Sequence, residues 1–210
     1  MSLKPKYDVL IFDFDNTLCN MNIYVAKVKL DDINEKDKTI KIDNIFRSMN
    51  TLFNDYVDLI NIFNDLKSKG VKLVIASFGN LKIITKIINV AFPNMFDYIL
   101  TTDNIDEEAN SGYIAKVFRH IVDPLCPRFY GKNIMIKTIM NKFNISDPTK
   151  IMFFDDDYSN AACSSAYRKI SSHNNTTHGI TARLLSDFVY IKEHQQNQIA
   201  GHKKKYVIYK

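Results

Sequence analysis

The chain has 210 residues, 46% of them hydrophobic and 24% charged, and its formal net charge at pH 7 is +5. This composition is that of an ordinary globular protein with enough apolar material for one core, so we expect a single domain over residues 1–210. No apolar run approaches the ~20 residues of a membrane span, and the first residues are polar, so we expect neither a membrane helix nor a secretory signal, and a cytoplasmic location.

The first predicted strand runs directly into two aspartates. Val9 to Phe12 is a short apolar run between polar flanks, which is typical of a buried parallel strand. Asp13 and Asp15 follow it, in a motif that ends at Thr17. Open α/β sheets bind ligands at the carboxyl ends of their strands. Two carboxylates there need a cation or a shared proton, and Mg²⁺ suits such oxygen ligands, although a plain polar turn would also explain the motif.

Residues 20–43 depart from the strand and helix alternation of the rest of the chain. Apolar side chains alternate with more polar ones over residues 24–30 and again at Ile40 and Ile42, and the charged stretch 31–38 lies between them. Alternation on both sides of a polar tip predicts a β-hairpin. The hairpin either serves the site or is a plain surface feature.

The second apolar strand, residues 71–77, ends in a hydroxyl residue. A long helical pattern over residues 45–66, expected in two pieces, precedes it, and Asn80 is placed to cap a helix over residues 81–92. The Ser77 hydroxyl and the backbone N–H that follows it are good donors to a phosphate oxygen. A serine in a strand-to-helix turn is also common without such a role.

A lysine opens a later helical pattern. We expect a strand over residues 98–101, a helix over 106–122 and a loop over 123–130, after which Lys132 begins an amphipathic segment. A cation at a helix start opposes the favourable direction of the helix dipole. Lys132 is therefore either solvated or placed to meet an anion, whereas Lys137 falls inside the helix and is expected to face solvent.

The last apolar strand, residues 151–154, is followed by three consecutive aspartates, 155–157, and then by Asn160. Three carboxylates after a buried strand are difficult to explain as surface residues. Further helices are expected over residues 158–168 and 181–190. The alternation of strands and helices predicts a doubly wound parallel sheet, an α/β fold.

Taken in order, the four motifs resemble those of the haloacid dehalogenase (HAD) superfamily of phosphohydrolases. They are a strand with DxDxT, a strand ending in Ser, a lysine at a helix start, and a strand followed by DDxxxN. Residues 131–160 are most similar to the magnesium-dependent phosphatase family, and the Scp-like carboxy-terminal-domain phosphatases come next. The resemblance covers residues 7–188 and implies a Rossmann-like fold with a β-hairpin flap and no large cap domain. The segment 20–43 matches neither group in length and charge.

The resemblance also implies a role for each principal site residue. Asp13 is the nucleophile that forms an aspartyl-phosphate, and Asp15 is the general acid and base. Ser77 and Lys132 bind the substrate phosphate, and Lys132 also neutralises charge beside Asp13. Mg²⁺ binds the carboxylates of Asp13 and Asp156 and the backbone carbonyl of Asp15.

Three further residues are expected to support the site. Asp155 orients Lys132 or the waters of the metal, Asn160 supports the metal shell, and Thr17 belongs to the first motif. Asp157 is expected to lie outside this shell.

The predicted function is hydrolysis of a phosphomonoester with Mg²⁺. The segments between the motifs are too short for a large cap, and an open site favours a phosphoprotein as substrate. The alternatives are a sugar phosphatase, a nucleic-acid 3′-phosphate phosphatase, or a non-catalytic binding scaffold.

Two compositional features are expected to have no part in the chemistry. Lys203–Lys205 belongs to a polar basic tail over residues 193–210, which we expect to be solvated, so neither nucleic acid nor membrane is an expected partner. The three cysteines are odd in number and lack CxxC spacing, which predicts free thiols in a reducing compartment: Cys19, Cys126 and Cys163.

Overall fold

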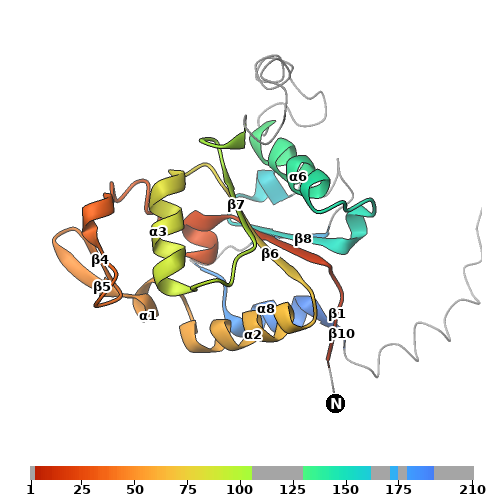
Figure 1. The fold of residues 1–210 in the computed structure, drawn as a ribbon, viewed down its shortest axis with the longest axis horizontal. Helices are drawn as coiled ribbons and strands as arrows, with labels where there is room; N and C mark the ends of the chain where they lie inside the picture. Colours follow the sequence, from red (N-terminus) through yellow and green to blue (C-terminus); the bar gives the residue numbers. More distant parts are fainter. Residues whose placement is uncertain (1–2, 106–129, 162–170, 175–178, 192–210) are drawn as a thin grey trace, which may run out of the picture.

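Five parallel strands form the central sheet, in the order β7-β6-β2-β8-β9 (Figure 1). The computed structural model describes residues 3–105, 130–161, 171–174 and 179–191. The strands are β2 (Val9–Phe12), β6 (Lys72–Ser77), β7 (Tyr98–Thr101), β8 (Ile151–Asp155) and β9 (Ser171–Asn174). The predicted α/β class with a parallel sheet is confirmed.

Helices cover both faces of this sheet, as a doubly wound fold requires (Figure 1). Among the described residues, α2 (Tyr56–Ser68), α3 (Leu81–Ala91) and α8 (Ala182–Val189) pack on one face, and α6 (Tyr130–Lys142) packs on the opposite face. Because successive strand side chains point to opposite faces, Leu10 and Phe12 lie in the core under the first three helices, and Val9 and Ile11 in the core under α6.

Aromatic packing fixes the two strands that carry acids at their ends. The ring of Phe12 on β2 stacks on that of Phe154 on β8, with centroids 5.1 Å apart, and meets the edge of Phe63 on α2 at 5.8 Å. All three side chains are fully buried, and each contributes roughly 1.5–3 kcal/mol through burial. This packing holds Asp13 and Asp155 at neighbouring strand ends.

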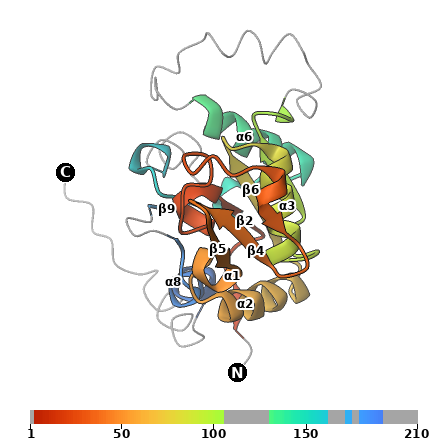
Figure 2. The ribbon, with the colours of Figure 1, turned by 90° about the vertical axis from the view of Figure 1, so that its left-hand side faces the viewer.

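Residues 33–48 form a small three-stranded antiparallel sheet, where a two-stranded hairpin was expected (Figure 2). Its strands are β3 (Ile33–Asn34), β4 (Thr39–Ile42) and β5 (Ile45–Ser48), and the short helical turn η2 (Leu30–Asp32) precedes them. The Lys86 ammonium on α3 donates to the Leu30 carbonyl at 3.1 Å and lies 3.5 Å from the Glu35 carboxylate. These contacts attach the small sheet to α3.

Residues 24–30, the expected first arm of the hairpin, are not a strand. The Asn22 side chain accepts a hydrogen bond from the Val25 backbone N–H at 2.8 Å, and Ala26 N donates to the Asn22 carbonyl at 3.0 Å. Local side-chain-to-backbone bonds of this kind compete with strand pairing. We call residues 22–28, which these bonds fold into a turn, the flap turn.

The helix expected from residue 45 begins later, because residues 45–48 pair with β4. Asp43 and Asn44 both have left-handed φ values, 51° and 63°, which suit the two-residue turn of a tight hairpin. The expected division of the helical pattern is present, as α1 (Met49–Leu52) and α2.

The remaining described elements are short. β1 (Lys4–Pro5) pairs antiparallel with β10 (Tyr190–Ile191), and the turn η3 (Pro148–Lys150) leads into β8. None of the helices in the described residues combines the length and the apolar character that a membrane span requires. The last residue of the expected loop 123–130, Tyr130, is the first residue of α6. The rest of that loop, the expected helix 106–122, the tail 193–210, and Cys126 and Cys163 lie outside the described residues.

Candidate active site

The carboxyl ends of β2, β6 and β8 bring the predicted motifs together. Asp13 directly follows β2, Ser77 is the last residue of β6, and Asp155 is the last residue of β8. In the strand order, β6 is the neighbour of β2 on one side, and β8 is its neighbour on the other side. Such a reversal of strand order creates a crevice at which α/β sheets bind ligands.

Lys132 on α6 is buried among these strand ends. Its ammonium lies 2.6 Å from Asp13 Oδ1, donates to the Ala76 carbonyl at 2.6 Å, and lies 3.5 Å from Asp155 Oδ2. The side chain is 1% exposed. Burial by itself lowers the pKa of Lys132, but the charges and hydrogen bonds of Asp13 and Asp155 together raise it above its ordinary value. The lysine is therefore a fixed positive charge at the site.

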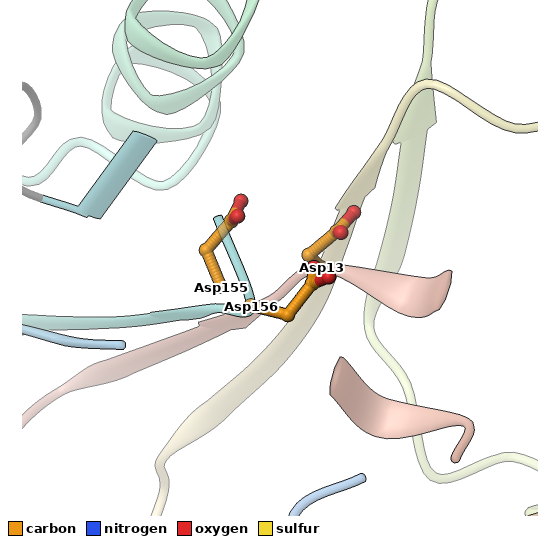
Figure 3. Close-up of side chains that lie close together, drawn as sticks. All are labelled: Asp13, Asp155 and Asp156. Carbon is orange, nitrogen blue, oxygen red and sulfur yellow. The ribbon is translucent and has the colours of Figure 1, made fainter. Parts of the chain in front are cut away.

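Asp13 and Asp155, which contact this charge, form a cluster of three carboxylates with Asp156 (Figure 3). One oxygen each of Asp13, Asp155 and Asp156 lies within 4.8 Å of the others. Burial raises the pKa of Asp155 to about 7, against the opposing charge of Lys132. Burial also raises the pKa of Asp13, and Lys132 again opposes the rise. Crowded, buried carboxylates of this kind favour a bound cation or a shared proton.

The donor set of this cluster fits Mg²⁺, which prefers oxygen ligands. Asn160 donates from Nδ2 to both oxygens of Asp155, at 3.1 and 3.2 Å. Its Oδ1 is buried and has no hydrogen-bond partner among the described residues. This buried amide oxygen next to Asp155 is of the kind that a hard cation or its waters accept as a partner.

The turn after β2 is tied to Asp156. Asn16 Nδ2 and Thr17 Oγ1 lie 3.4 and 3.3 Å from the Asp156 oxygens. Asn16 has φ 56°, a left-handed conformation that Asn tolerates better than most residues. The sequence motif includes Asn16, but its contact with Asp156 was not predicted. The αL preference of Asn is the signal that would have singled it out.

Asp15 lies in a different environment from the three clustered acids. Its Oδ1 accepts a hydrogen bond from the Ile23 backbone N–H of the flap turn, at 2.7 Å. Burial raises its pKa to about 6. A carboxyl with such a pKa can both donate and accept a proton near neutral pH.

Ser77 and the two residues after it form the other side of the site. The buried Ser77 Oγ accepts a hydrogen bond from Gly79 N at 3.1 Å. The ring centroid of Phe78, a half-exposed side chain, lies 4.8 Å from Lys132 Nζ. Sequence reasoning missed Phe78, since one aromatic residue in a turn carries no signal of its own.

The other predicted residues occupy the following positions. Asp157 is exposed and its Oδ1 accepts from Ser159 N at 2.7 Å, and Lys137 is exposed on α6. Cys19 is a buried free thiol, and burial raises its pKa to about 12. Neither the exposed acid nor the protonated thiol is placed for chemistry at the cluster.

A cavity of about 570 Å³ opens beside Asp15. The flap turn forms one wall and the start of α3 forms the other. Most of its lining is apolar, and its residues are Phe14, Asp15, Ile23, Tyr24, Val25, Lys27, Val28, Gly79, Asn80, Ile83 and Ile84. The site thus consists of a buried charged cluster and an adjoining apolar cavity.

No model of a known protein family matches the chain, and no curated protein matches it significantly. Among solved structures, the chain is similar to the magnesium complex of a HAD family enzyme from Bacteroides thetaiotaomicron, with 15% identity, a TM-score of 0.48, and coverage of 83% of this chain and 96% of that one. The complex of that enzyme with magnesium and inorganic phosphate matches with 15% identity, a TM-score of 0.46, and coverage of 80% and 93%.

The cobalt-bound deoxy-D-mannose-octulosonate 8-phosphate phosphatase from Haemophilus influenzae is also similar, with 12% identity, a TM-score of 0.47, and coverage of 87% of this chain and 86% of that one. Identities this low do not transfer an activity. The function of this chain therefore has to rest on its own side chains.

Proposed function

We propose that this protein is a Mg²⁺-dependent phosphomonoester hydrolase of the HAD type that acts through an aspartyl-phosphate. The observation that carries the proposal is the 2.6 Å contact between the buried Lys132 ammonium and Asp13 Oδ1, inside a cluster of three carboxylates. Phosphoryl transfer depends on positioning and charge neutralisation. A fixed cation against one carboxylate makes that carboxylate a competent nucleophile towards an anionic phosphate.

In the first step, a carboxylate oxygen of Asp13 forms a bond to phosphorus as the bond between phosphorus and the leaving oxygen breaks. Asp15, with its pKa raised to about 6, gives its proton to that oxygen. In the second step, Asp15 takes a proton from water, the water oxygen attacks phosphorus, and inorganic phosphate and the free Asp13 carboxylate result. Ser77 and Lys132 bind the phosphoryl oxygens in both steps.

The residues that would hold Mg²⁺ are Asp13 and Asp156 through their carboxylates and Asp15 through its backbone carbonyl. Asp155 and Asn160 flank them, while Thr17 fixes Asp156 by its hydrogen bond. The bound ion supplies electrostatic stabilisation of the transferring phosphoryl group. The arrangement of the cluster supports this assignment, because one oxygen each of Asp13, Asp155 and Asp156 lies within 4.8 Å of the others and a hard cation prefers such oxygen ligands.

The proposed substrate is a phosphoprotein. The site lies at the carboxyl ends of the strands, and the small sheet is attached to α3. Tyr24, Val25 and Phe78 expose 75%, 70% and 51% of their surface near the site. Exposed apolar side chains around a polar centre are characteristic of surfaces that bind macromolecules.

Hydrolysis of para-nitrophenyl phosphate tests the activity. We expect turnover with Mg²⁺, loss of turnover on addition of EDTA, and recovery with excess Mg²⁺. Asp13→Asn should lower kcat by ~10³-fold or more, because the nucleophile is removed. Asp8→Asn is the matched control, since Asp8 is exposed before β2, at the opposite end of the same strand. Normal turnover of Asp13→Asn would show that Asp13 is not the nucleophile.

A further inference from the structure

A cavity lies beside Asp15, and the flap turn and the start of α3 line it. The clustered acids and Lys132 can recognise only a phosphate and a metal, which all phosphomonoesters share. The cavity has a volume of about 570 Å³, which is within the range of small-molecule binding sites. Most of its lining is apolar.

Gly79 connects this cavity to the phosphate site. A Cβ on Gly79 would lie 3.4 Å from Ser77 Oγ and 3.6 Å from Asp15 Oδ2. The position of its missing side chain is thus bordered by the phosphate-binding hydroxyl, by the proposed acid and, at 2.9 Å, by Ile84 Cδ1 of the cavity wall. The leaving oxygen must lie between phosphorus and the Asp15 carboxyl that protonates it. The alcohol that bears this oxygen then extends from Gly79 into the cavity.

The walls of the cavity define the chemistry of that alcohol. Ile23 and Val28 of the flap turn are buried on one side, and Ile83 and Ile84 of α3 lie on the other. Besides Asp15, the polar side chains of the lining are Tyr24, Lys27 and Asn80, and the Asn80 oxygen already accepts from Ile83 N at 3.2 Å. A sugar would place most of its hydroxyl groups against the apolar part of the lining, at a cost for each unpaired group. An aromatic ring has an apolar surface that can pack against the apolar residues of these walls.

We infer that the cavity binds the aryl group of an aryl phosphomonoester, of the kind presented by phosphotyrosine. The inference rests on the proposed hydrolase function and narrows its substrate class. The bond from phosphorus to the phenolic oxygen breaks as Asp13 bonds to phosphorus, Asp15 protonates the phenolate, and a neutral phenol leaves. The small side chain of phosphoserine would leave the apolar walls in contact with water.

Non-hydrolysable phosphonates test this cavity without relying on turnover. Methylphosphonate, benzylphosphonate and naphthylmethylphosphonate carry the same anionic group with no, one and two rings. Isothermal titration in Mg²⁺ should show an affinity that rises about 10-fold from methyl to benzyl, because apolar surface is buried, and rises again to naphthylmethyl. Equal affinities across the series would overturn the inference.

A pair of variants locates the effect. Val25→Asn replaces an exposed apolar side chain in the cavity wall, and Val57→Asn makes the same change at a comparably exposed position of α2 outside the lining. Val25→Asn should reduce the benzyl-to-methyl affinity ratio by ~3-fold or more, while Val57→Asn leaves it unchanged. An unchanged ratio in both variants would place the ring outside this cavity and contradict the inference.

Steady-state kinetics then show whether the aryl group belongs to a protein or to a small molecule. Phosphotyrosine as a free amino acid, a phosphotyrosine peptide and a matched phosphoserine peptide are compared by kcat/KM. A gain for the phosphotyrosine peptide over the amino acid identifies a protein substrate, and equal values identify a small aryl phosphate. Preference for the phosphoserine peptide overturns the inference. If no monoester is hydrolysed but the phosphonates still differ in affinity, the hydrolase proposal fails and the aryl cavity stands.

Discussion

Lys132 shows how one residue combines stability with chemistry. Burying an ammonium group costs several kcal/mol unless the charge is paired and its hydrogen bonds are made. Lys132 is 1% exposed and has both an acid and a backbone carbonyl within 2.6 Å. The sequence could indicate that a lysine in the first turn of a helix needs an anion. The helical pattern alone could not say which acid, because the answer depends on how α6 packs across the ends of β2 and β8, and only the resemblance to a known family named Asp13 and Asp155.

At the residue scale, we predict the effect of adding a methyl group at Gly79. Gly79→Ala should lower kcat/KM by roughly 10- to 100-fold, because the methyl group occupies the space between Ser77 and Asp15 and displaces the leaving oxygen. Its closest contact, 2.9 Å from Ile84 Cδ1, is with the end of a flexible side chain, so stability should change little. Steady-state kinetics and the urea midpoint measure the two effects.

Gly70→Ala is the control for this substitution. We expect it to lower stability and to leave activity unchanged, the opposite of Gly79→Ala. Gly70 follows the end of α2, has φ 83°, and has open space around its Cβ position. Alanine there is strained by ~1 kcal/mol, so the urea midpoint should fall while kcat/KM stays normal. A loss of activity in Gly70→Ala equal to that in Gly79→Ala would mean that the Gly79 effect is not local.

At the scale of elements, the sequence predicted the central strands and failed in the flap. Parallel strands buried on both faces are continuous apolar runs, and residues 9–12 and 151–154 show that pattern without ambiguity. In residues 24–30, apolar and polar side chains alternate as they do in a strand, but the Asn22 side chain accepts a hydrogen bond that forms a local turn there. The strand 45–48 was missed because its turn is Asp43-Asn44, a weaker hairpin signal than Asn-Gly.

At the element scale, we predict that the Asp43-Asn44 turn holds the small sheet together. Asn44 has φ 63°, which a β-branched residue adopts at a cost of roughly 1–2 kcal/mol. Asn44→Val should therefore speed amide hydrogen exchange across residues 39–48, whereas Asn44→Gly should not. Exchange in β2 and β8 should be unchanged in both variants. Equal protection of residues 39–48 in Asn44→Val and the original chain would show that the turn does not hold the small sheet.

For the whole molecule, the arrangement of the sheet assembles the site. The acids and the lysine come from residues as far apart as Asp13 and Asp156, and each side chain depends on the packing of a different element. The sequence could predict that carboxylates lie at the ends of strands. The three consecutive aspartates alone do not separate Asp155, buried against Lys132, from the exposed Asp157, because that difference arises where the chain turns after β8. Only the resemblance to a known family assigned the two acids different positions.

His173 gives a prediction about the pH dependence of global stability. Its ring lies 4.4 Å from that of Phe188 and 6.3 Å from that of Phe154, and burial lowers its pKa below the ordinary value of 6.5. The unfolded chain therefore binds a proton at this residue at a higher pH than the folded chain does. As pH falls through 6.5, the free energy of unfolding should decrease, and the loss is complete below the folded-state pKa.

The acids of the site act in the opposite direction, so the test compares two proteins. Asp15 and Asp155 have pKa values raised to about 6 and about 7, and the folded state binds their protons more tightly, so their contribution to stability grows as pH falls. His173→Phe keeps a ring at this position and removes the titration. Urea unfolding between pH 7.5 and pH 5 should show that the original chain loses more stability, or gains less, than His173→Phe. Parallel pH profiles of the two proteins would mean that the pKa of His173 is the same in the folded and unfolded chains.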